Sequence, residues 1–171
     1  EKSAENVQTD SNPVPILAYY YIWFDPGSWD RAKTDYPLLG RYSSDDEKVM
    51  LQHIRWAKEA GINGFIVSWK STDVLNRRLD LLVKLAEQED FKLVIIYQGL
   101  DFYRDPLPVD RIADDLAFFI EQYAGNEVFS LYAKPVVIWS GTWEFSTAEI
   151  EQVSQAVRGS ILLLENEKNI E

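Results

Sequence analysis

Ile16-Leu17-Ala18-Tyr19-Tyr20-Tyr21-Ile22-Trp23-Phe24 is an unbroken run of apolar and aromatic residues near the start of the chain. A strand with one face in water alternates apolar and polar residues, whereas a strand of a covered parallel sheet reads as a continuous apolar run. This stretch therefore predicts a buried strand of a parallel sheet. Further strand-like runs follow at residues 64–69, 92–97, 135–139 and 161–164.

A helical pattern separates each pair of these runs. One helical face is formed by four apolar residues at intervals of four, three and four, namely Leu75, Leu79, Leu82 and Ala86. Two capping boxes, from Ser44 to Glu47 and from Ser146 to Glu149, predict where the first and the last helix begin. The elements thus alternate strictly between strand and helix.

That alternation predicts the α/β class, because parallel neighbouring strands need a crossover and a helix is the usual one. Five strands and four helices are about half of an eightfold (β/α) TIM barrel. We therefore predict a partial barrel over residues 16–171 that is incomplete at its C-terminal side. The polar residues 1–15 predict a flexible lead. A flavodoxin-like three-layer sheet also has five parallel strands and is the alternative, although a long loop at residues 25–43 favours the barrel.

Composition excludes several classes of protein. The 171 residues carry a net charge of −11, which opposes nucleic-acid binding because phosphates call for clustered Lys and Arg. No apolar run approaches the roughly 18 residues of a membrane span. The absence of cysteine excludes disulfides and thiolate metal sites. A polar lead of this kind often follows a removed signal peptide or lipid anchor, so we expect a secreted or cell-surface protein, with the cytosol left open.

In a parallel α/β barrel, ligands meet the carboxyl ends of the strands. Aromatic planes there can stack on the apolar faces of sugar rings, and polar side chains can bond the hydroxyls. The residues at these ends that we predict to contact substrate are Trp23, Asp25, Trp69, Lys70, Gln98, Trp139 and Trp143. They predict an oligosaccharide or polysaccharide partner and call for neither a metal nor another cofactor. The alternative is that the large aromatic residues only fill the top of the barrel.

The single histidine, His53, falls in the middle of the first predicted helix. A Ser-His-Asp triad would have to use it, and its place on the helix opposes that. We predict a half-buried, hydrogen-bonded structural histidine rather than a metal ligand. No H-E-x-x-H, Walker A or G-x-S-x-G pattern occurs in the chain.

Several segments resemble the N-terminal half of glycoside hydrolase family 99, the group of endo-α-mannosidases and endo-α-mannanases. The segments that carry the resemblance are Gly40-Arg41-Tyr42-Ser43-Ser44-Asp45, His53-Ile54-Arg55-Trp56-Ala57-Lys58-Glu59-Ala60-Gly61-Ile62, Gly64-Phe65-Ile66-Val67-Ser68-Trp69, Tyr19-Tyr20-Tyr21-Ile22-Trp23 and Lys134-Pro135-Val136. The resemblance implies a (β/α)₈ barrel that acts on α-mannosides with retention of configuration and without a metal. Matched to the family, Tyr21, Trp23 and Trp69 look like sugar-contacting positions.

The chain also departs from the family in two places. The family's third strand ends in an Ile-Glu-Pro-Tyr segment whose Glu touches substrate, whereas this chain has Ile96-Tyr97-Gln98-Gly99. The family's catalytic carboxylates lie near the seventh and eighth strands, beyond the fifth predicted strand of this chain. The resemblance therefore supports the architecture more than the catalytic residues.

Two hypotheses about function follow. The first is the N-terminal part of a glycoside hydrolase-like protein that acts on α-mannoside-type or related glycans. Glycoside hydrolysis needs two carboxyl groups, and Glu165, at the end of the fifth strand, is the candidate acid; it could instead be a solvated charge beside Glu167. The second is a non-catalytic carbohydrate-binding module or pseudo-enzyme. Whether this chain is an enzyme therefore stays open, and a half-barrel is expected to self-associate through its open edges.

Overall fold

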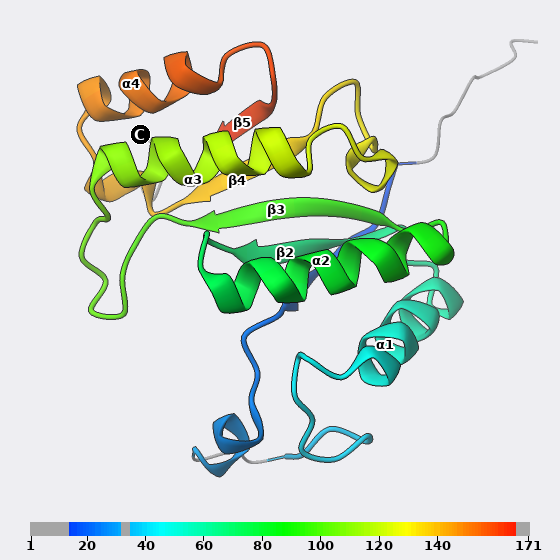
Figure 1. Ribbon diagram of the computed structural model, residues 1–171. Coiled ribbons are helices and arrows are strands. Elements are labelled where there is room, and N and C mark those ends of the chain that lie inside the picture. The colour runs from blue at the N-terminus through cyan, green and yellow to red at the C-terminus, as the bar shows by residue number, and fades with distance from the viewer. Residues whose placement is uncertain (1–13, 32–34, 167–171) are drawn as a thin grey trace, which may run out of the picture.

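The computed structural model describes residues 14–31 and 35–166 of the chain. Strands and helices alternate along it, as predicted (Figure 1). The strands are β1 (Leu17–Tyr21), β2 (Gly64–Trp69), β3 (Lys92–Gln98), β4 (Val136–Ser140) and β5 (Leu162–Glu165). The α-helices are α1 (Glu47–Glu59), α2 (Asp73–Gln88), α3 (Val109–Gln122) and α4 (Thr147–Val157). Short 3-10 turns follow β1 (Pro26–Asp30) and β4 (Thr142–Glu144), and another precedes β4 (Glu127–Phe129).

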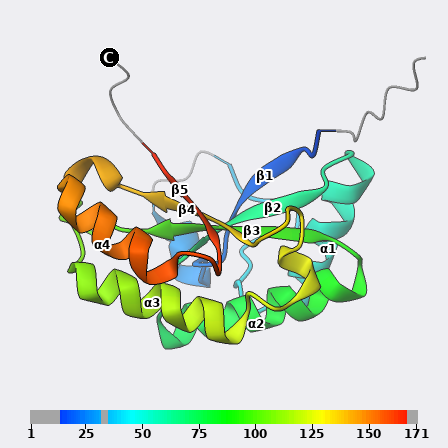
Figure 2. The same ribbon diagram turned by 90° about the horizontal axis from the view of Figure 1, so that it is seen from above.

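The sheet runs in the order β1-β2-β3-β4-β5, and every neighbouring pair is parallel. All four α-helices lie on one face of it (Figure 2). A flavodoxin-like sheet would place its first strand between the second and the third and would carry helices on both faces. The order excludes that alternative and confirms an open, TIM-barrel-like α/β fold, with β1 and β5 at the two edges of the described sheet.

The two faces of the sheet differ in burial, most clearly on the edge strands β1 and β5. Phe65, Val67 and Trp69 of β2 point toward the helices and are buried in the core. Alternate residues face the other side, which we call the inner face. There Tyr19 is 59% exposed and Leu164 is 42% exposed. The apolar run of β1 predicts cover on both faces, and the described residues leave the inner face of this edge strand exposed. Toward the middle of the sheet, Ser68, Val94 and Val136 of the same face are buried.

The inner face is mostly apolar. Its uncharged polar side chains, Ser68, Gln98 and Ser140, lie near the carboxyl ends of the strands, and Lys92 lies at the amino end of β3. The strand residues on this face are Leu17, Tyr19, Tyr21, Gly64, Ile66, Ser68, Lys92, Val94, Ile96, Gln98, Val136, Ile138, Ser140, Leu162 and Leu164. This division matches a barrel, where apolar layers fill the interior and the ligand site lies at the carboxyl ends.

One of the two predicted helix starts needs correction. Ser146 and Glu149 form the expected capping box of α4, with the Ser146 amide donating to Glu149 at 2.8 Å. Helix α1, in contrast, is capped by Asp46, whose carboxylate accepts from the amides of Lys48 and Val49. Ser44 is buried instead, and its hydroxyl accepts from the Phe24 amide at 3.1 Å. The local sequence predicts that Ser44 caps the helix, but its hydroxyl is used in a contact with a residue 20 positions away.

The remaining boundaries agree closely with the predicted ones, except at β1. That strand ends at Tyr21, and residues 22–24 lie beyond the sheet. Most of the predicted N-terminal lead, residues 1–13, falls outside the described part of the chain. No helix in the described ranges is long and apolar enough to cross a membrane.

The open sheet yields a prediction about association. The 171-residue chain should self-associate, because the inner face and the edges of β1 and β5 leave apolar and backbone groups in water. Leu164→Lys should shift the chain toward monomer in sedimentation velocity. Val74→Lys on α2 is the matched control, since Val74 is 43% exposed but lies in the helix layer. A wild-type chain that sediments as a monomer at all concentrations would refute the expectation.

Candidate functional site

Two aromatic side chains at the carboxyl end of β1 are open to solvent. Tyr21, the last residue of the strand, is 44% exposed, and Trp23 is 45% exposed. Their ring centroids are 5.5 Å apart with the planes at 60°. Exposed aromatic rings at the ligand-binding end of a barrel strand offer a surface on which a flat apolar ligand face can lie.

The Trp23 ring belongs to a stack of three aromatic side chains. Trp23 lies on Phe24 with centroids 4.5 Å apart, and Phe24 lies on Trp29 at 4.6 Å. Trp29 is buried, and its indole N–H donates to the Tyr42 carbonyl at 2.8 Å. The stack therefore ties the exposed Trp23 to the interior of the loop that follows β1.

A buried arginine fixes the same loop to helix α2. The Arg78 side chain is only 3% exposed, and it donates to Asp25 at 2.6 Å, to Asp45 at 2.7 Å and to the Ile22 carbonyl at 3.2 Å. The hydrogen bond from Arg78 holds the pKa of the Asp45 carboxyl well below its ordinary value. A charge buried this deeply persists only with such partners, so the chain on both sides of Pro26–Asp30 is pinned to one helix.

A second buried polar network joins β2, β3 and α3. The Tyr97 hydroxyl donates to Asp115 at 2.9 Å, and Arg111 donates to the other oxygen of this carboxylate at 2.8 Å. Asp115 also accepts from the Ser71 amide at 3.2 Å, directly after β2. Burial, together with the Asp115 charge, raises the pKa of the Tyr97 hydroxyl. The strand ends behind the inner face are thus hydrogen-bonded to the helix layer.

The expectation that Trp69 and Trp139 contact a ligand needs correction. Both side chains are 0% exposed and point toward the helices. The Trp69 indole donates to Asn76 of α2 at 3.0 Å, and Trp139 packs against Phe145 at 4.9 Å. The sequence placed these residues correctly at strand ends, but side chains alternate along a strand and these two fall on the covered side.

Among the other predicted contacts, Gln98 is best placed. It is half-buried on the inner face, beside Ser140 in the register of β3 and β4. Lys70 and Trp143 are half-buried just beyond β2 and in the turn after β4. Asp25 is exposed but ion-paired with Arg78, which gives it a structural partner. Tyr21, Trp23 and Gln98 therefore form the candidate site.

The candidate acid Glu165 also needs correction. It pairs with Trp139 in register, which puts it on the helix-facing side, and it accepts from the Ser154 hydroxyl of α4 at 3.0 Å. Asp101, at the end of β3, accepts from two backbone amides of its own loop. Within the described strands, no carboxylate faces the inner side. The described strands therefore supply no inward-facing acid pair.

His53 has the structural role expected for it. It is half-buried on α1, and its Nδ1 lies 3.0 Å from the Tyr20 hydroxyl. Burial lowers its pKa. Among the residues that the structure describes, no group of three or more His, Cys, Asp or Glu side chains is placed to hold a metal ion.

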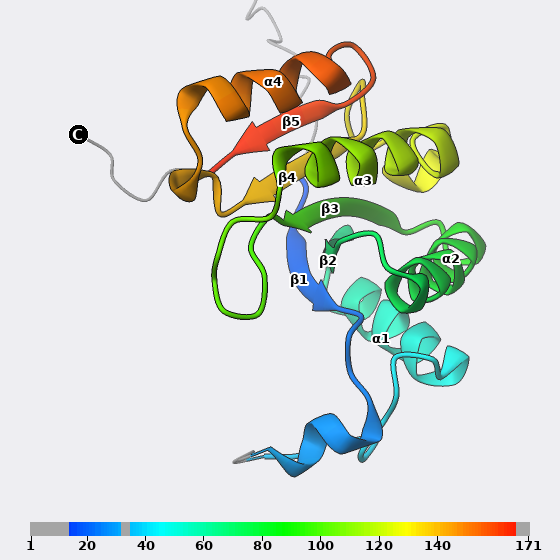
Figure 3. The ribbon, with the colours of Figure 1, turned by 60° about the vertical axis from the view of Figure 1, so that its left-hand side comes forward.

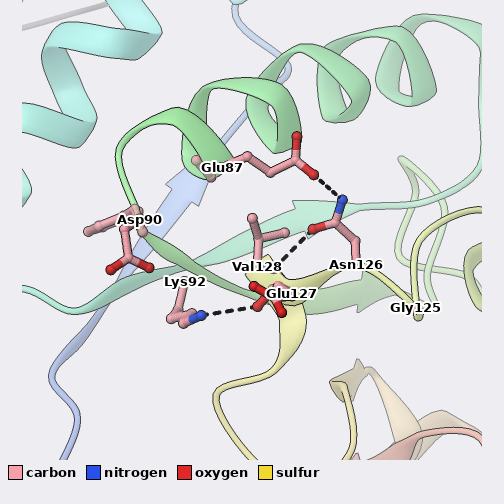
Figure 4. Close-up of a pocket in the computed structure, with 9 residues that line it drawn as sticks. Glu87, Asp90, Lys92, Gly125, Asn126, Glu127 and Val128 are labelled. Atoms are coloured by element: carbon pink, nitrogen blue, oxygen red, sulfur yellow. Dashed lines mark hydrogen bonds between the residues drawn. The ribbon is translucent and has the colours of Figure 1, made fainter.

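Two hollows among the described residues lie at the opposite end of the strands. One of about 490 Å³ is lined by residues including Glu87, Lys92 and Asn126, with Lys92 donating to the Glu127 carbonyl (Figure 4). Another of about 730 Å³ adjoins it, next to Asn63 and Tyr132. These surround the amino-terminal ends of β2 to β4, the end that in barrels serves stability rather than ligand binding.

Sequence reasoning missed one feature at the carboxyl end. Phe102 and Tyr103, in the loop between β3 and α3, are 85% and 80% exposed. Two consecutive aromatic residues directly after a strand end were the available signal.

These features define an open parallel (β/α) sheet of the barrel type, with an aromatic and polar rim at its carboxyl end. No protein-family profile matches the sequence, and no curated protein gives a significant match. Solved structures do match. An endo-α-mannosidase of glycoside hydrolase family 99 from Bacteroides thetaiotaomicron, in complex with bis-tris-propane, aligns with TM-score 0.74 at 21% identity over 88% of this chain and 51% of that one.

A second structure of the Bacteroides thetaiotaomicron enzyme gives TM-score 0.72 at 17% identity, over 89% of this chain and 55% of that chain. A glycoside hydrolase-like protein gives 0.62 at 18% identity, over 91% and 54%. The expected resemblance in fold is confirmed. The chain spans about half the length of the solved structures it matches, and at these identities the likeness establishes the fold alone.

The Arg78 anchor makes a testable contribution to stability. Arg78→Met should lower the free energy of unfolding by about 1–3 kcal/mol at pH 7, because it removes charge-assisted hydrogen bonds from a buried site whose carboxylate partners remain partly in water. The Asp45 pKa is lower in the folded than in the unfolded chain. Its contribution is therefore present above about pH 3.9 and is lost as the pH falls below that value.

Urea unfolding at a series of pH values checks both statements. The wild type should lose its advantage over Arg78→Met as the solution becomes acidic. Arg77→Met is the matched control, since Arg77 also pairs with Asp45 but is 62% exposed. An equal loss of stability in the two variants at pH 7 would contradict the role assigned to Arg78.

Proposed function

We propose that this chain forms the N-terminal half of a glycoside hydrolase-like barrel whose carboxyl-end rim binds α-mannoside-type or related glycans. The observation that carries the proposal is the pair of exposed rings, Tyr21 and Trp23, at the carboxyl end of a barrel strand. Gln98 and Ser140 supply polar groups on the same face. The fold shared with endo-α-mannosidase structures supports a glycan as the ligand.

The chemistry of the site favours binding over catalysis by these residues themselves. Hydrolysis of a glycosidic bond needs one carboxyl to protonate the leaving oxygen and a second to act as nucleophile or base. Glu165 faces α4, and Asp25 is held by Arg78. In the hydrolase interpretation, the acid pair would come from further βα units that close the barrel. Those units would also cover the apolar inner face.

The second candidate is a carbohydrate-binding protein or pseudo-enzyme that needs no acid pair. It is favoured by the absence of inward-facing carboxylates from the described strands. A search for reducing ends released from α-mannan separates the two. Turnover by a protein that contains this chain supports the hydrolase, and saturable binding without turnover supports the binding protein.

We also propose a secreted or cell-surface location, where such glycans are met.

Glycan binding should depend on the β1 platform. Trp23→Ala should weaken binding of an α-mannan by roughly tenfold, because the ring loses its stacking surface while the rest of the fold stays in place. Isothermal titration calorimetry measures the change. Trp56→Ala is the matched control, since Trp56 is 37% exposed but lies on helix α1. Equal affinity in wild type and Trp23→Ala would refute the assigned platform.

A further inference from the structure

The loop between β3 and α3 carries two adjacent aromatic side chains almost entirely in water. The Phe102 and Tyr103 rings are 5.6 Å apart between centroids and perpendicular, at 87°. Their exposed fractions, given above, exceed that of Trp23. Neighbouring large aromatic side chains in water form the kind of apolar patch that marks a contact site.

A set of hydrogen bonds holds the tip of this loop in one shape. The Asp101 carboxylate accepts from the amides of Tyr103 at 2.8 Å and Asp105 at 2.9 Å. The Asp101 amide donates to the Asp105 carbonyl at 2.8 Å. Arg104 has φ 75°, a left-handed conformation that residues with side chains rarely adopt. Backbone strain maintained in this way is concentrated at functional loops.

The base of the loop is fixed to the rim of the sheet. The Gly99 amide donates to the Ser140 carbonyl at 3.1 Å, and Leu107 donates back to Gly99 at 2.9 Å. The Leu100 side chain packs on Gly141, where an added Cβ would come within 2.6 Å of it. The loop therefore projects from the carboxyl ends of the strands (Figure 3), the end at which Tyr21 and Trp23 also lie.

We propose that Phe102 and Tyr103 form an outer contact for a glycan chain, beyond the sugar residues that Tyr21 and Trp23 hold. This inference rests on the proposed glycan-binding function and deepens it, by assigning to the loop a contact with a glycan longer than the one that Tyr21 and Trp23 hold. The rings offer apolar faces for the C–H surface of a pyranose. Arg104 and Asp105 are exposed beside them and can bond its hydroxyls. Continuity with the rim favours a glycan over a protein partner.

The test compares a long and a short ligand by isothermal titration calorimetry. The double variant Phe102→Ala/Tyr103→Ala should bind yeast-type α-mannan about tenfold more weakly than the wild type. Its affinity for a mannobiose, which in this proposal is held by Tyr21 and Trp23 alone, should be unchanged. Tyr132→Ala is the matched control, because Tyr132 is 49% exposed but lines a hollow at the amino-terminal ends of the strands.

The loop shape can be tested separately. Asp101→Ala removes the side-chain acceptor for both amides and should weaken mannan binding, whereas Asp101→Asn keeps one acceptor oxygen and should bind nearly as well as the wild type. Circular dichroism that matches the wild type shows that the variants are folded. Equal mannan affinity in Asp101→Ala and Asp101→Asn would contradict the part given to the loop conformation.

The outcomes separate this inference from the function on which it rests. If Trp23→Ala weakens both ligands and the double variant weakens neither, the outer contact is refuted and the rim platform stands. If the wild type binds neither ligand, both proposals fall. If the double variant changes only the sedimentation of the chain, the loop is a protein contact and the glycan assignment is overturned.

Discussion

The architecture depends on the sequential pairing of five parallel strands. A βαβ connection is almost always right-handed, so a chain that adds each new strand beside the previous one puts every helix on the same face. That constraint alone gives the sheet one buried face and one open face (Figure 2). It also places all the loops that follow strands at the carboxyl end of the sheet. The aromatic platform, the polar end of the inner face and the β3–α3 loop are consequences of it.

Two buried charged networks join the carboxyl ends of the strands to the helix layer. Arg78 reaches from α2 to the loop after β1, and Asp115 reaches from α3 to Tyr97 and Ser71. Both place a charge in the helix layer, where an unpaired ion would be costly, so both require the strand ends to stay where their partners are. The exposed rim is therefore attached to the helix layer through buried charges that require their partners to stay in place.

The same geometry determines which polar groups of the candidate site are exposed and which have partners. The rim displays rings and hydroxyl- or amide-bearing side chains, while two of the carboxylates near it have other partners: Asp25 pairs with Arg78 and Glu165 accepts from Ser154. In the proposed function, such a surface orients a sugar, whereas glycoside hydrolysis also needs a carboxyl to protonate the leaving oxygen. In the hydrolase interpretation, the acid and the nucleophile would come from further strands that close the barrel.

Sequence alone determined the order of the elements, the parallel sheet, the barrel-type fold and the strand ends at which a ligand would be met. Those features follow from local periodicity, which can be read within short stretches of sequence, and from the rule that a crossover connects parallel strands. Only the tertiary structure decided which side chain faces which way. Ser44 accepts from the Phe24 amide instead of capping helix α1. Trp69 and Trp139 are buried against the helices, and Phe102 and Tyr103 are exposed. A shift of one residue along a strand reverses the face of every side chain, and that register is set by contacts between segments far apart in the chain.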